Sequence, residues 1–342
     1  MLIFEKREIK YRNTPTIFFA LTAFFLICFF APACPAQESS SQIKSSPQGT
    51  HTLTLTVNGL ERTYIVYVPR TYNPAKKTAL VIMLHGGGGK AKGAMWETGW
   101  ADKAEQEGFL AVFPNAMPPN PKQRSSFVFN PQLWNDGSDR FFPGSSAPDD
   151  VAFINAMIDA LIARFAVDEK KIFLTGFSNG ASLSFLAGIE LANRIAAIAP
   201  VAGACWPVSL KLSSPVSLLY ITGTEDPLNV IEGGVPRLAS GQSDKVRGKP
   251  KPPVRDSIMK WAKALACPAA PANTVKNNGV SVETFRPCSH GSEVVYITVE
   301  GLGHTWAGGR SLLPETMVGK TTDKINANDV IWDFFQKHVK AP

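Results

Sequence analysis

Residues 171–182 read Lys-Ile-Phe-Leu-Thr-Gly-Phe-Ser-Asn-Gly-Ala-Ser and place Ser178 between an apolar run and a helical pattern. The first five residues have the character of a buried strand, and residues 179–193 have helical spacing. Gly176 and Gly180 stand two residues before and two residues after the serine, where a tight turn brings the backbones of a strand and a helix together. This context predicts a nucleophile elbow that presents the hydroxyl of Ser178.

The rest of the chain alternates strand-like and helix-like segments. Residues 53–57 and 62–68 alternate apolar with polar side chains across Asn58-Gly59, a dipeptide typical of tight hairpin turns. Solidly apolar runs, typical of strands buried on both faces, follow at residues 79–84, 109–113, 171–175, 195–201, 216–221 and 294–299. Helical spacing is found at residues 96–107, 150–165, 179–193, 255–266 and 323–339. The alternation predicts one α/β domain over residues 52–342, with a mostly parallel central sheet, helices on both faces and an antiparallel N-terminal hairpin.

The N-terminus has the pattern of an export signal. Basic side chains precede an apolar run at residues 17–30, and the small residues of 31–36 follow it. The run is shorter than the roughly 18 apolar residues that a membrane-spanning helix needs. We therefore expect residues 1–36 to be a cleaved signal peptide and residues 37–51 a flexible tether, which makes the protein secreted or periplasmic with no stable membrane span. An uncleaved anchor and lipid attachment at Cys34 are the alternatives.

Composition and charge exclude several classes of protein. The 342 residues are 44% hydrophobic and 18% charged, which excludes a disordered or collagen-like chain. The formal net charge of +7 becomes +5 once residues 1–36 are removed with their four basic and two acidic side chains. The local basic cluster consists of Lys245, Arg247, Lys249, Lys251 and Arg255. It has no interleaved aromatic residues, so we expect a solvated loop and no nucleic-acid binding, with weak attraction to an anionic polymer or cell surface as the alternative.

Three cysteines lie in the expected domain, and none has the C-x-x-C spacing of a metal site. In an oxidising compartment we expect Cys267 to pair with Cys288, because the two bracket a Pro-, Asn- and Gly-rich segment just before a strand. Cys205 then remains a buried free thiol. Asp136 and Asp139 lie in a Gly-rich loop but are too few to hold calcium. We expect neither a metal nor a cofactor.

A glycine-rich loop follows the apolar run at residues 79–84. His85 opens this loop and is followed by four glycines, which leave backbone N–H groups exposed. Such groups stabilise the oxyanion that forms when a serine attacks a carbonyl. We expect the N–H of Asn179, with that of Gly86 or Gly87, to form the oxyanion hole, and His85 to shape the loop.

A serine nucleophile needs a base, and two histidines flank the last predicted strand at residues 294–299. Parallel strands bring their carboxyl ends together at one edge of a sheet. His304 follows the strand and is expected to reach the serine, whereas His290 precedes it and lies at the opposite edge. His51 and His338 are expected to be solvated surface residues.

The third member of the site is expected to be an acid at the end of the strand at residues 216–221, where it fixes the tautomer of the imidazole. Asp226 is the candidate, with Glu225 as its rival and a surface-turn role as the alternative for either. The resulting chain order of Ser178, Asp226 and His304 is the order found in α/β hydrolases.

Five motifs in consistent order resemble the esterase family of polyhydroxybutyrate depolymerases and feruloyl esterases. They are Gly176-Phe-Ser-Asn-Gly180, Leu84-His-Gly-Gly-Gly88, Asp149-Asp-Val-Ala-Phe153, Gly223-Thr-Glu-Asp226 and Gly303-His-Thr-Trp306. The resemblance spans residues 52–339 and implies the α/β-hydrolase fold and a Ser-His-Asp triad that acts on carboxylic esters. Ala181 and Ala307 stand where many relatives carry Gly and Pro, and no Thr-rich linker or polymer-binding module follows, which counts against attack on crystalline polymer.

The expected function is that of a secreted serine carboxylesterase that forms an acyl-enzyme and acts, like a polyhydroxybutyrate depolymerase, on hydroxyalkanoate oligomers or polymer. A feruloyl or acetyl-xylan esterase is the alternative, and a serine peptidase or a non-catalytic surface-binding protein are alternatives of other classes. Trp134, Trp206 and Trp306 are expected to line an aromatic substrate cleft, with core packing as the alternative for each.

Overall fold

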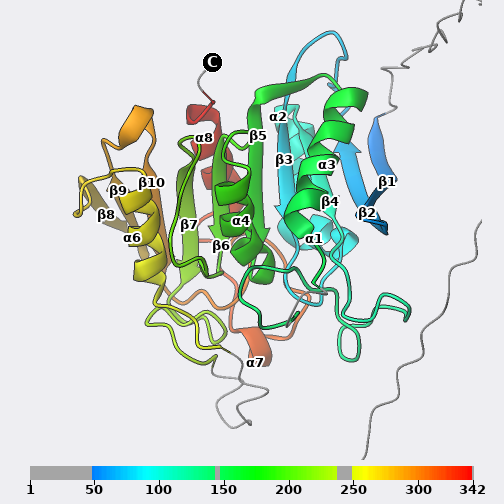
Figure 1. Ribbon diagram of the computed structural model, residues 1–342. Coiled ribbons are helices and arrows are strands. Elements are labelled where there is room, and N and C mark those ends of the chain that lie inside the picture. Colours follow the sequence, from blue (N-terminus) through cyan, green and yellow to red (C-terminus); the bar gives the residue numbers. More distant parts are fainter. Residues whose placement is uncertain (1–47, 143–146, 237–248, 341–342) are drawn as a thin grey trace, which may run out of the picture. The chain divides into compact units, whose positions relative to one another are not determined.

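A ten-stranded sheet forms the centre of the molecule (Figure 1). The computed structural model describes residues 48–142, 147–236 and 249–340. The strands are β1 (Gly49–Val57), β2 (Leu60–Val68), β3 (Thr78–Leu84), β4 (Leu110–Pro114), β5 (Val167–Phe177), β6 (Ala197–Val201), β7 (Ser217–Gly223), β8 (Asn273–Asn277), β9 (Val280–Phe285) and β10 (Val294–Val299). Their order across the sheet is β1-β2-β4-β3-β5-β6-β7-β10-β9-β8.

The inner strands run parallel and the edges do not. From β4 to β10 every neighbouring pair is parallel, whereas β1, β2 and β4 on one side and β10, β9 and β8 on the other pair antiparallel. The expected mostly parallel sheet with an antiparallel N-terminal hairpin is confirmed. The carboxyl ends of β3, β5, β7 and β10 therefore lie at the same edge of the sheet, and the loops that follow them meet there.

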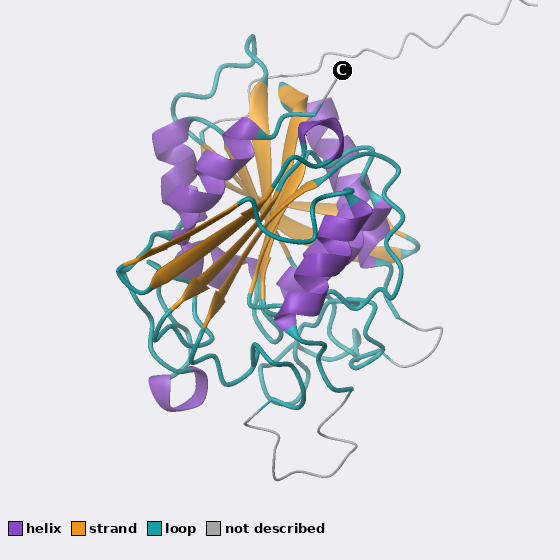
Figure 2. Cartoon of the chain, turned by 90° about the vertical axis from the view of Figure 1, so that its left-hand side faces the viewer, coloured by secondary structure: helices purple, strands orange, loops and turns teal. Residues whose placement is uncertain are grey.

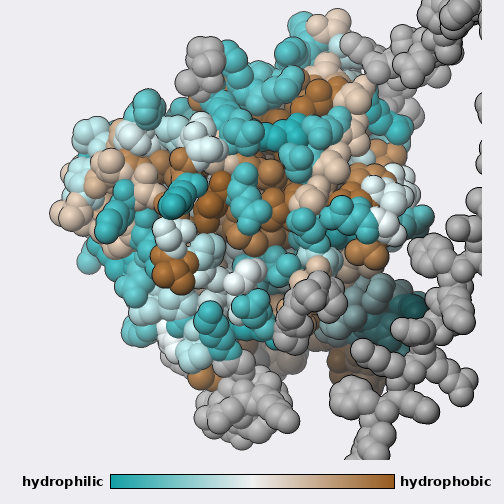
Figure 3. Space-filling view, in the orientation of Figure 1, coloured by the Kyte–Doolittle hydropathy of each residue, from teal (hydrophilic) through white to brown (hydrophobic). Residues whose placement is uncertain are grey.

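Helices cover both faces of the sheet (Figures 1 and 2). They are α1 (Ala91–Thr98), α2 (Trp100–Glu107), α3 (Asp150–Arg164), α4 (Asn179–Glu190), α6 (Val254–Ala264), α7 (Glu315–Val318) and α8 (Ala327–Lys337). Side chains of α3, α4 and α6 belong to one buried hydrophobic cluster, and those of α1, α2 and α8 to another. The surface over α3, α4 and α6 mixes hydrophilic with hydrophobic residues (Figure 3).

The solidly apolar strands supply both clusters at once. In β3, Leu80 and Ile82 join the cluster beneath α3 and α4, while Val81 and Met83 join the opposite one. Successive side chains of a strand point to opposite faces, so a strand covered on both sides must be apolar at every position.

Several elements differ from the sequence-based expectations. β1 begins at Gly49, inside the stretch expected to be a tether, because residues from Gly49 onward pair with β2 as far as Val68. The helix expected at residues 96–107 is two helices, because Gly99 takes a left-handed conformation with φ of 70°. The hairpin of β8 and β9 was not expected, although Asn278-Gly279 forms its turn, because every residue of β8 is exposed and shows no apolar alternation.

The expected disulfide between Cys267 and Cys288 is present and links the segment after α6 to the segment after β9. Cys205 is a buried free thiol, and burial raises its pKa to about 12. Among the described residues, no helix has the length and apolar character that a membrane crossing requires. The expected signal peptide, most of the expected tether, and Lys245 and Arg247 of the basic cluster lie outside the described residues.

Two glycines allow β5, α4 and the end of β3 to pack in backbone contact. A Cβ atom at Gly176 would lie 2.4 Å from the carbonyl oxygen of Gly180. A Cβ atom at Gly180 would lie 2.4 Å from the carbonyl oxygen of Leu84. Backbone atoms cannot move aside without displacing the helix from the sheet, so both positions require glycine.

We predict that Gly176→Ala lowers the free energy of unfolding by about 1–3 kcal/mol, because the added methyl group overpacks a rigid contact. Gly93→Ala is the matched control. Gly93 lies within α1, where the nearest atom to an added Cβ belongs to the Leu312 side chain, and alanine favours a helix interior by up to about 1 kcal/mol. Thermal unfolding followed by circular dichroism measures both variants. Equal stability of Gly176→Ala and wild type would contradict the packing described here.

Candidate active site

Ser178 occupies the turn between β5 and α4 in a strained backbone conformation. β5 ends at Phe177, α4 begins at Asn179, and Ser178 between them has φ of 54° and ψ of −115°. A non-glycine residue in such a conformation costs on the order of 1–3 kcal/mol and persists only where its surroundings hold it. The N–H of Ser178 donates to the carbonyl of Val201, which fixes the turn to β6. The side chain remains partly accessible to solvent.

Of the three residues expected to act together, His304 lies within hydrogen-bond distance of both of the others. His304 Nε2 lies 2.8 Å from Ser178 Oγ, and His304 Nδ1 lies 2.7 Å from Asp226 Oδ2. Asp226 lies in the loop after β7, and His304 lies in the loop after β10. With Nδ1–H donating to Asp226, Nε2 is left to accept the proton of the serine hydroxyl.

Asp226 is buried and remains ionised because of its partners. Burial alone would raise the pKa of Asp226, but the His304 imidazole and the N–H groups of Asn229 and Leu228 lower it below its usual value. Those N–H groups lie 2.7 Å and 2.8 Å from Asp226 Oδ1. Its sequence rival Glu225 is exposed to solvent. Asp226, not Glu225, is therefore the acid that contacts the imidazole.

His85 holds the glycine loop in one orientation. Its Nε2 accepts from the N–H of Ala116 at 3.1 Å, so its Nδ1 carries the proton and donates to the carbonyl of Gly86 at 2.7 Å. Burial lowers the pKa of His85 to about 4, which keeps the ring neutral. The N–H and C=O of a trans peptide point in opposite directions, so the N–H of Gly87 points away from His85. This geometry favours Gly87 over Gly86 as an oxyanion donor.

The glycine loop lies directly against the elbow. A Cβ atom at Gly86 would lie 3.6 Å from Cβ of Ser178, and one at Gly87 would lie 3.6 Å from Cβ of Asn179. The two backbone segments that carry the expected oxyanion donors are therefore neighbours. The N–H of Asn179 belongs to the first turn of α4, where the helix leaves its N–H groups without partners within the helix.

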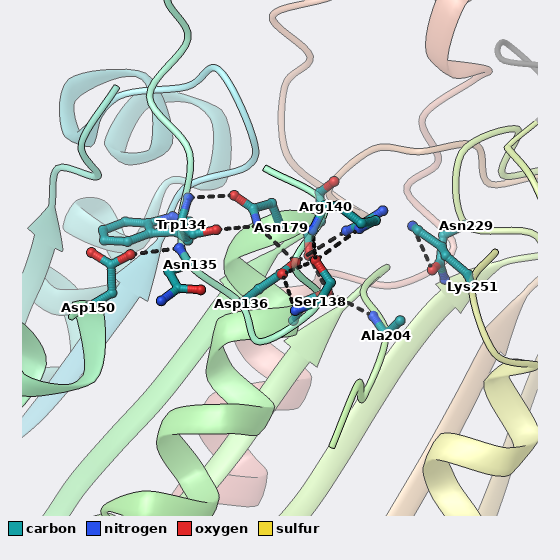
Figure 4. A network of polar contacts seen from close by, with 12 residues as sticks. Trp134, Asn135, Asp136, Ser138, Arg140, Asp150, Asn179, Ala204, Asn229 and Lys251 are labelled. Carbon is teal, nitrogen blue, oxygen red and sulfur yellow. Dashed lines mark hydrogen bonds and ion pairs between the residues drawn. The ribbon is translucent and has the colours of Figure 1, made fainter. Parts of the chain in front are cut away.

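A buried polar network that the sequence did not indicate anchors Asn179 (Figure 4). The Asn179 side chain accepts from the N–H of Trp134 at 2.7 Å and donates to Asp136 Oδ2 at 3.0 Å. Asp136 also accepts from Arg140 at 3.2 Å. The sequence suggested only a calcium-binding role for Asp136, for which it has too few partners, whereas its carboxylate accepts from the side chain of the residue after Ser178. The signal in the sequence is an aspartate directly after Trp-Asn in the long segment at residues 114–148.

Two of the three tryptophans expected to bind substrate are core residues, and that prediction is wrong for them. Trp134 is fully buried and its indole N–H donates to the carbonyl of His85. Trp306 is buried and its indole N–H donates to Asn328. Trp206 lies beneath the guanidinium of Arg140 and is 7% exposed.

Phe127 and Phe129, by contrast, are exposed aromatic residues, at 51% and 92%. The Phe127 ring packs against Gly88, at the end of the glycine loop.

The remaining histidines lie away from the triad. His290 precedes β10, as expected, at the opposite edge of the sheet. His338 was expected to be solvated, but its side chain is 8% exposed and lies 3.3 Å from Glu293, because the end of α8 packs over the start of β10. His51 lies in β1. Within the part of the chain that the structure describes, no group of three His, Cys, Asp or Glu side chains forms a metal site.

Sequence comparison finds esterases. A family model described as Phospholipase/Carboxylesterase matches residues 69–230, a span that contains Ser178 and Asp226 and ends before His304. Feruloyl esterase B of Piromyces equi is 30% identical over 262 residues, which cover 73% of this chain and 44% of that protein. The putative esterase NocK of Nocardia uniformis subsp. tsuyamanensis is 26% identical over 324 residues, which cover 89% of this chain and 88% of that protein. This chain thus spans less than half of the first relative and most of the second.

Structural comparison finds the same fold. The acetyl xylan esterase from Aspergillus awamori superposes with a TM-score of 0.53 at 17% identity, over 75% of this chain and 94% of that one. Identity at this level supports the fold alone. Together, the sheet order and this superposition show the α/β-hydrolase fold, and the relatives found by sequence are named as esterases.

Proposed function

We propose that this chain is a serine carboxylesterase that removes feruloyl or acetyl groups from plant cell-wall polysaccharide through an acyl-enzyme on Ser178. The observation that carries the proposal is the continuous hydrogen-bonded path from Ser178 Oγ through His304 to the buried carboxylate of Asp226. The acyl groups follow from the names of the relatives, feruloyl esterase B and a bifunctional acetylxylan esterase/xylanase. These names favour the alternative from the sequence over its first interpretation, a polyhydroxybutyrate depolymerase.

In the proposed mechanism, His304 Nε2 takes the proton of Ser178 as Oγ attacks the ester carbonyl. Asp226 holds the imidazole in the required tautomer and stabilises the imidazolium that forms. The oxyanion is held by the N–H groups of Asn179 and Gly87, and its collapse expels the alcohol, which takes the proton from His304. A water activated by His304 then attacks the acyl-enzyme and releases the acid.

Export remains part of the proposal. The disulfide between Cys267 and Cys288 is typical of proteins that fold in an oxidising compartment. Secretion would bring the enzyme to a polymeric substrate that does not enter cells.

We predict that Asp226→Asn lowers kcat by about 10³- to 10⁴-fold, because an amide in place of the carboxylate favours the wrong tautomer of His304. Glu225→Gln is the matched control, since Glu225 is the adjacent acid and is exposed. This control is expected to keep wild-type kcat on 4-nitrophenyl acetate. Loss of activity in Glu225→Gln together with retained activity in Asp226→Asn would show that Glu225, and not Asp226, is the acid.

We predict that folded Ser178→Ala hydrolyses neither methyl ferulate nor acetylated xylan, and that the wild type hydrolyses at least one of them faster than hydroxybutyrate trimer. Product release measured by chromatography ranks the three esters by kcat/KM. A wild type that prefers the hydroxybutyrate trimer would overturn the proposed substrate class and keep the mechanism. A wild type that cleaves only a peptide amide would identify a peptidase, and a wild type without any hydrolysis would indicate a binding protein.

A further inference from the structure

Cationic side chains gather near Asp226, the acid of the proposed triad. Arg140 and Lys251 approach the site from separate segments that both lie at the carboxyl edge of the sheet (Figure 4). Lys249 and the indole of Trp206 lie next to them. The mechanism proposed above uses none of these four residues.

Arg140 is tied to the elbow through Asp136. Its Nη2 lies 3.2 Å from Asp136 Oδ2, its Nε donates to Ser138 Oγ at 3.1 Å, and its Cζ lies 4.5 Å from the centre of the Trp206 ring. Asp136 in turn binds the side chain of Asn179, the residue after the nucleophile. The guanidinium has more N–H groups than these acceptors use, and 13% of its side chain remains exposed.

Lys251 is tied to the acid of the triad through Asn229. Its Nζ donates to Asn229 Oδ1 at 3.2 Å, and the N–H of Asn229 donates to Asp226 Oδ1 at 2.7 Å. No described carboxylate lies within ion-pair distance of this ammonium group. Burial first, and then the charge of Arg140, lower the pKa of Lys251 to about 8, while Asp226 and Asp136 act in the opposite direction.

The indole N–H of Trp206 is a third donor in this group. It is buried and has no hydrogen-bond acceptor among the described residues. Lys249 Nζ lies 5.8 Å from the centre of the same ring. A buried donor without an acceptor costs about 1–3 kcal/mol. Because Arg140 has unused N–H groups, Lys251 has no described carboxylate partner and the Trp206 indole has no acceptor, the cluster has an excess of donors and of positive charge.

We propose that Arg140 and Lys251 form a carboxylate subsite next to the triad, so that the enzyme prefers esters that also carry a carboxylate group. The inference rests on the proposed esterase function and adds a substrate feature to it. A carboxylate supplies the acceptor oxygens that the donors lack and the negative charge that Lys251 lacks. The group can belong to the acyl part or to the alcohol part of the ester, and the two sources share this chemistry.

Two pairs of esters separate the sources. For the acyl part, 4-nitrophenyl hydrogen succinate is compared with its neutral methyl ester, and for the alcohol part 4-acetoxybenzoate is compared with methyl 4-acetoxybenzoate. Each kcat/KM is divided by the rate of alkaline hydrolysis of the same ester, which removes intrinsic reactivity. The wild type is expected to prefer the charged member of one pair by about tenfold, the effect of one hydrogen bond to a charged group.

Lys251→Met is expected to abolish this preference, and Lys251→Arg, which keeps the charge, is expected to retain it. Lys276→Met is the matched control, because Lys276 lies in the exposed edge strand β8 and is expected to leave the ratio unchanged. The wild type offers a test without any variant, since 0.5 M salt is expected to reduce the preference for the charged ester by screening.

The result that overturns the inference is an equal ratio in wild type and Lys251→Met while both hydrolyse the neutral esters, and the proposed function then stands. If the wild type hydrolyses no member of either pair, the proposed function fails instead.

Discussion

The active site depends on a single backbone conformation at Ser178. With φ of 54° and ψ of −115°, this residue lies where a side chain is strained, and the strain directs the hydroxyl out of the turn. The surrounding packing offsets the cost. Leu174 of β5 and Leu183 and Phe185 of α4 are fully buried, and each such side chain contributes roughly 1.5–3 kcal/mol. The core therefore holds the proposed nucleophile in place.

The two buried histidines of the site, His85 and His304, have different roles because their surroundings differ. Both ring nitrogens of His85 hydrogen-bond to backbone groups, and burial keeps the ring neutral, so the ring holds the glycine loop in one orientation. His304 instead contacts the ionised carboxylate of Asp226, which is prepared to stabilise a positive ring during turnover. The same side chain is thus a structural element in one loop and, in the proposed mechanism, the proton carrier in another.

The sequence predicted the parts of the site that depend on local pattern. The elbow follows from two glycines between a strand and a helix, and His304 follows from the rule that parallel strands end at one edge. The network around Asp136 was not predictable in this way, because it requires residues 134–140 to contact Asn179, which lies 43 residues after Asp136. The burial of Trp134 was not predictable for the same reason, since it depends on contacts with His85 and Asn179 that no local pattern specifies.

The most direct test of the account is the reaction of the native protein with a fluorophosphonate, which bonds covalently to a serine activated by a neighbouring imidazole. The account predicts one adduct in the intact mass spectrum, located on the peptide that contains Ser178, and no adduct after thermal unfolding. A folded protein that forms no adduct, or one that carries the adduct on a different serine, would contradict it.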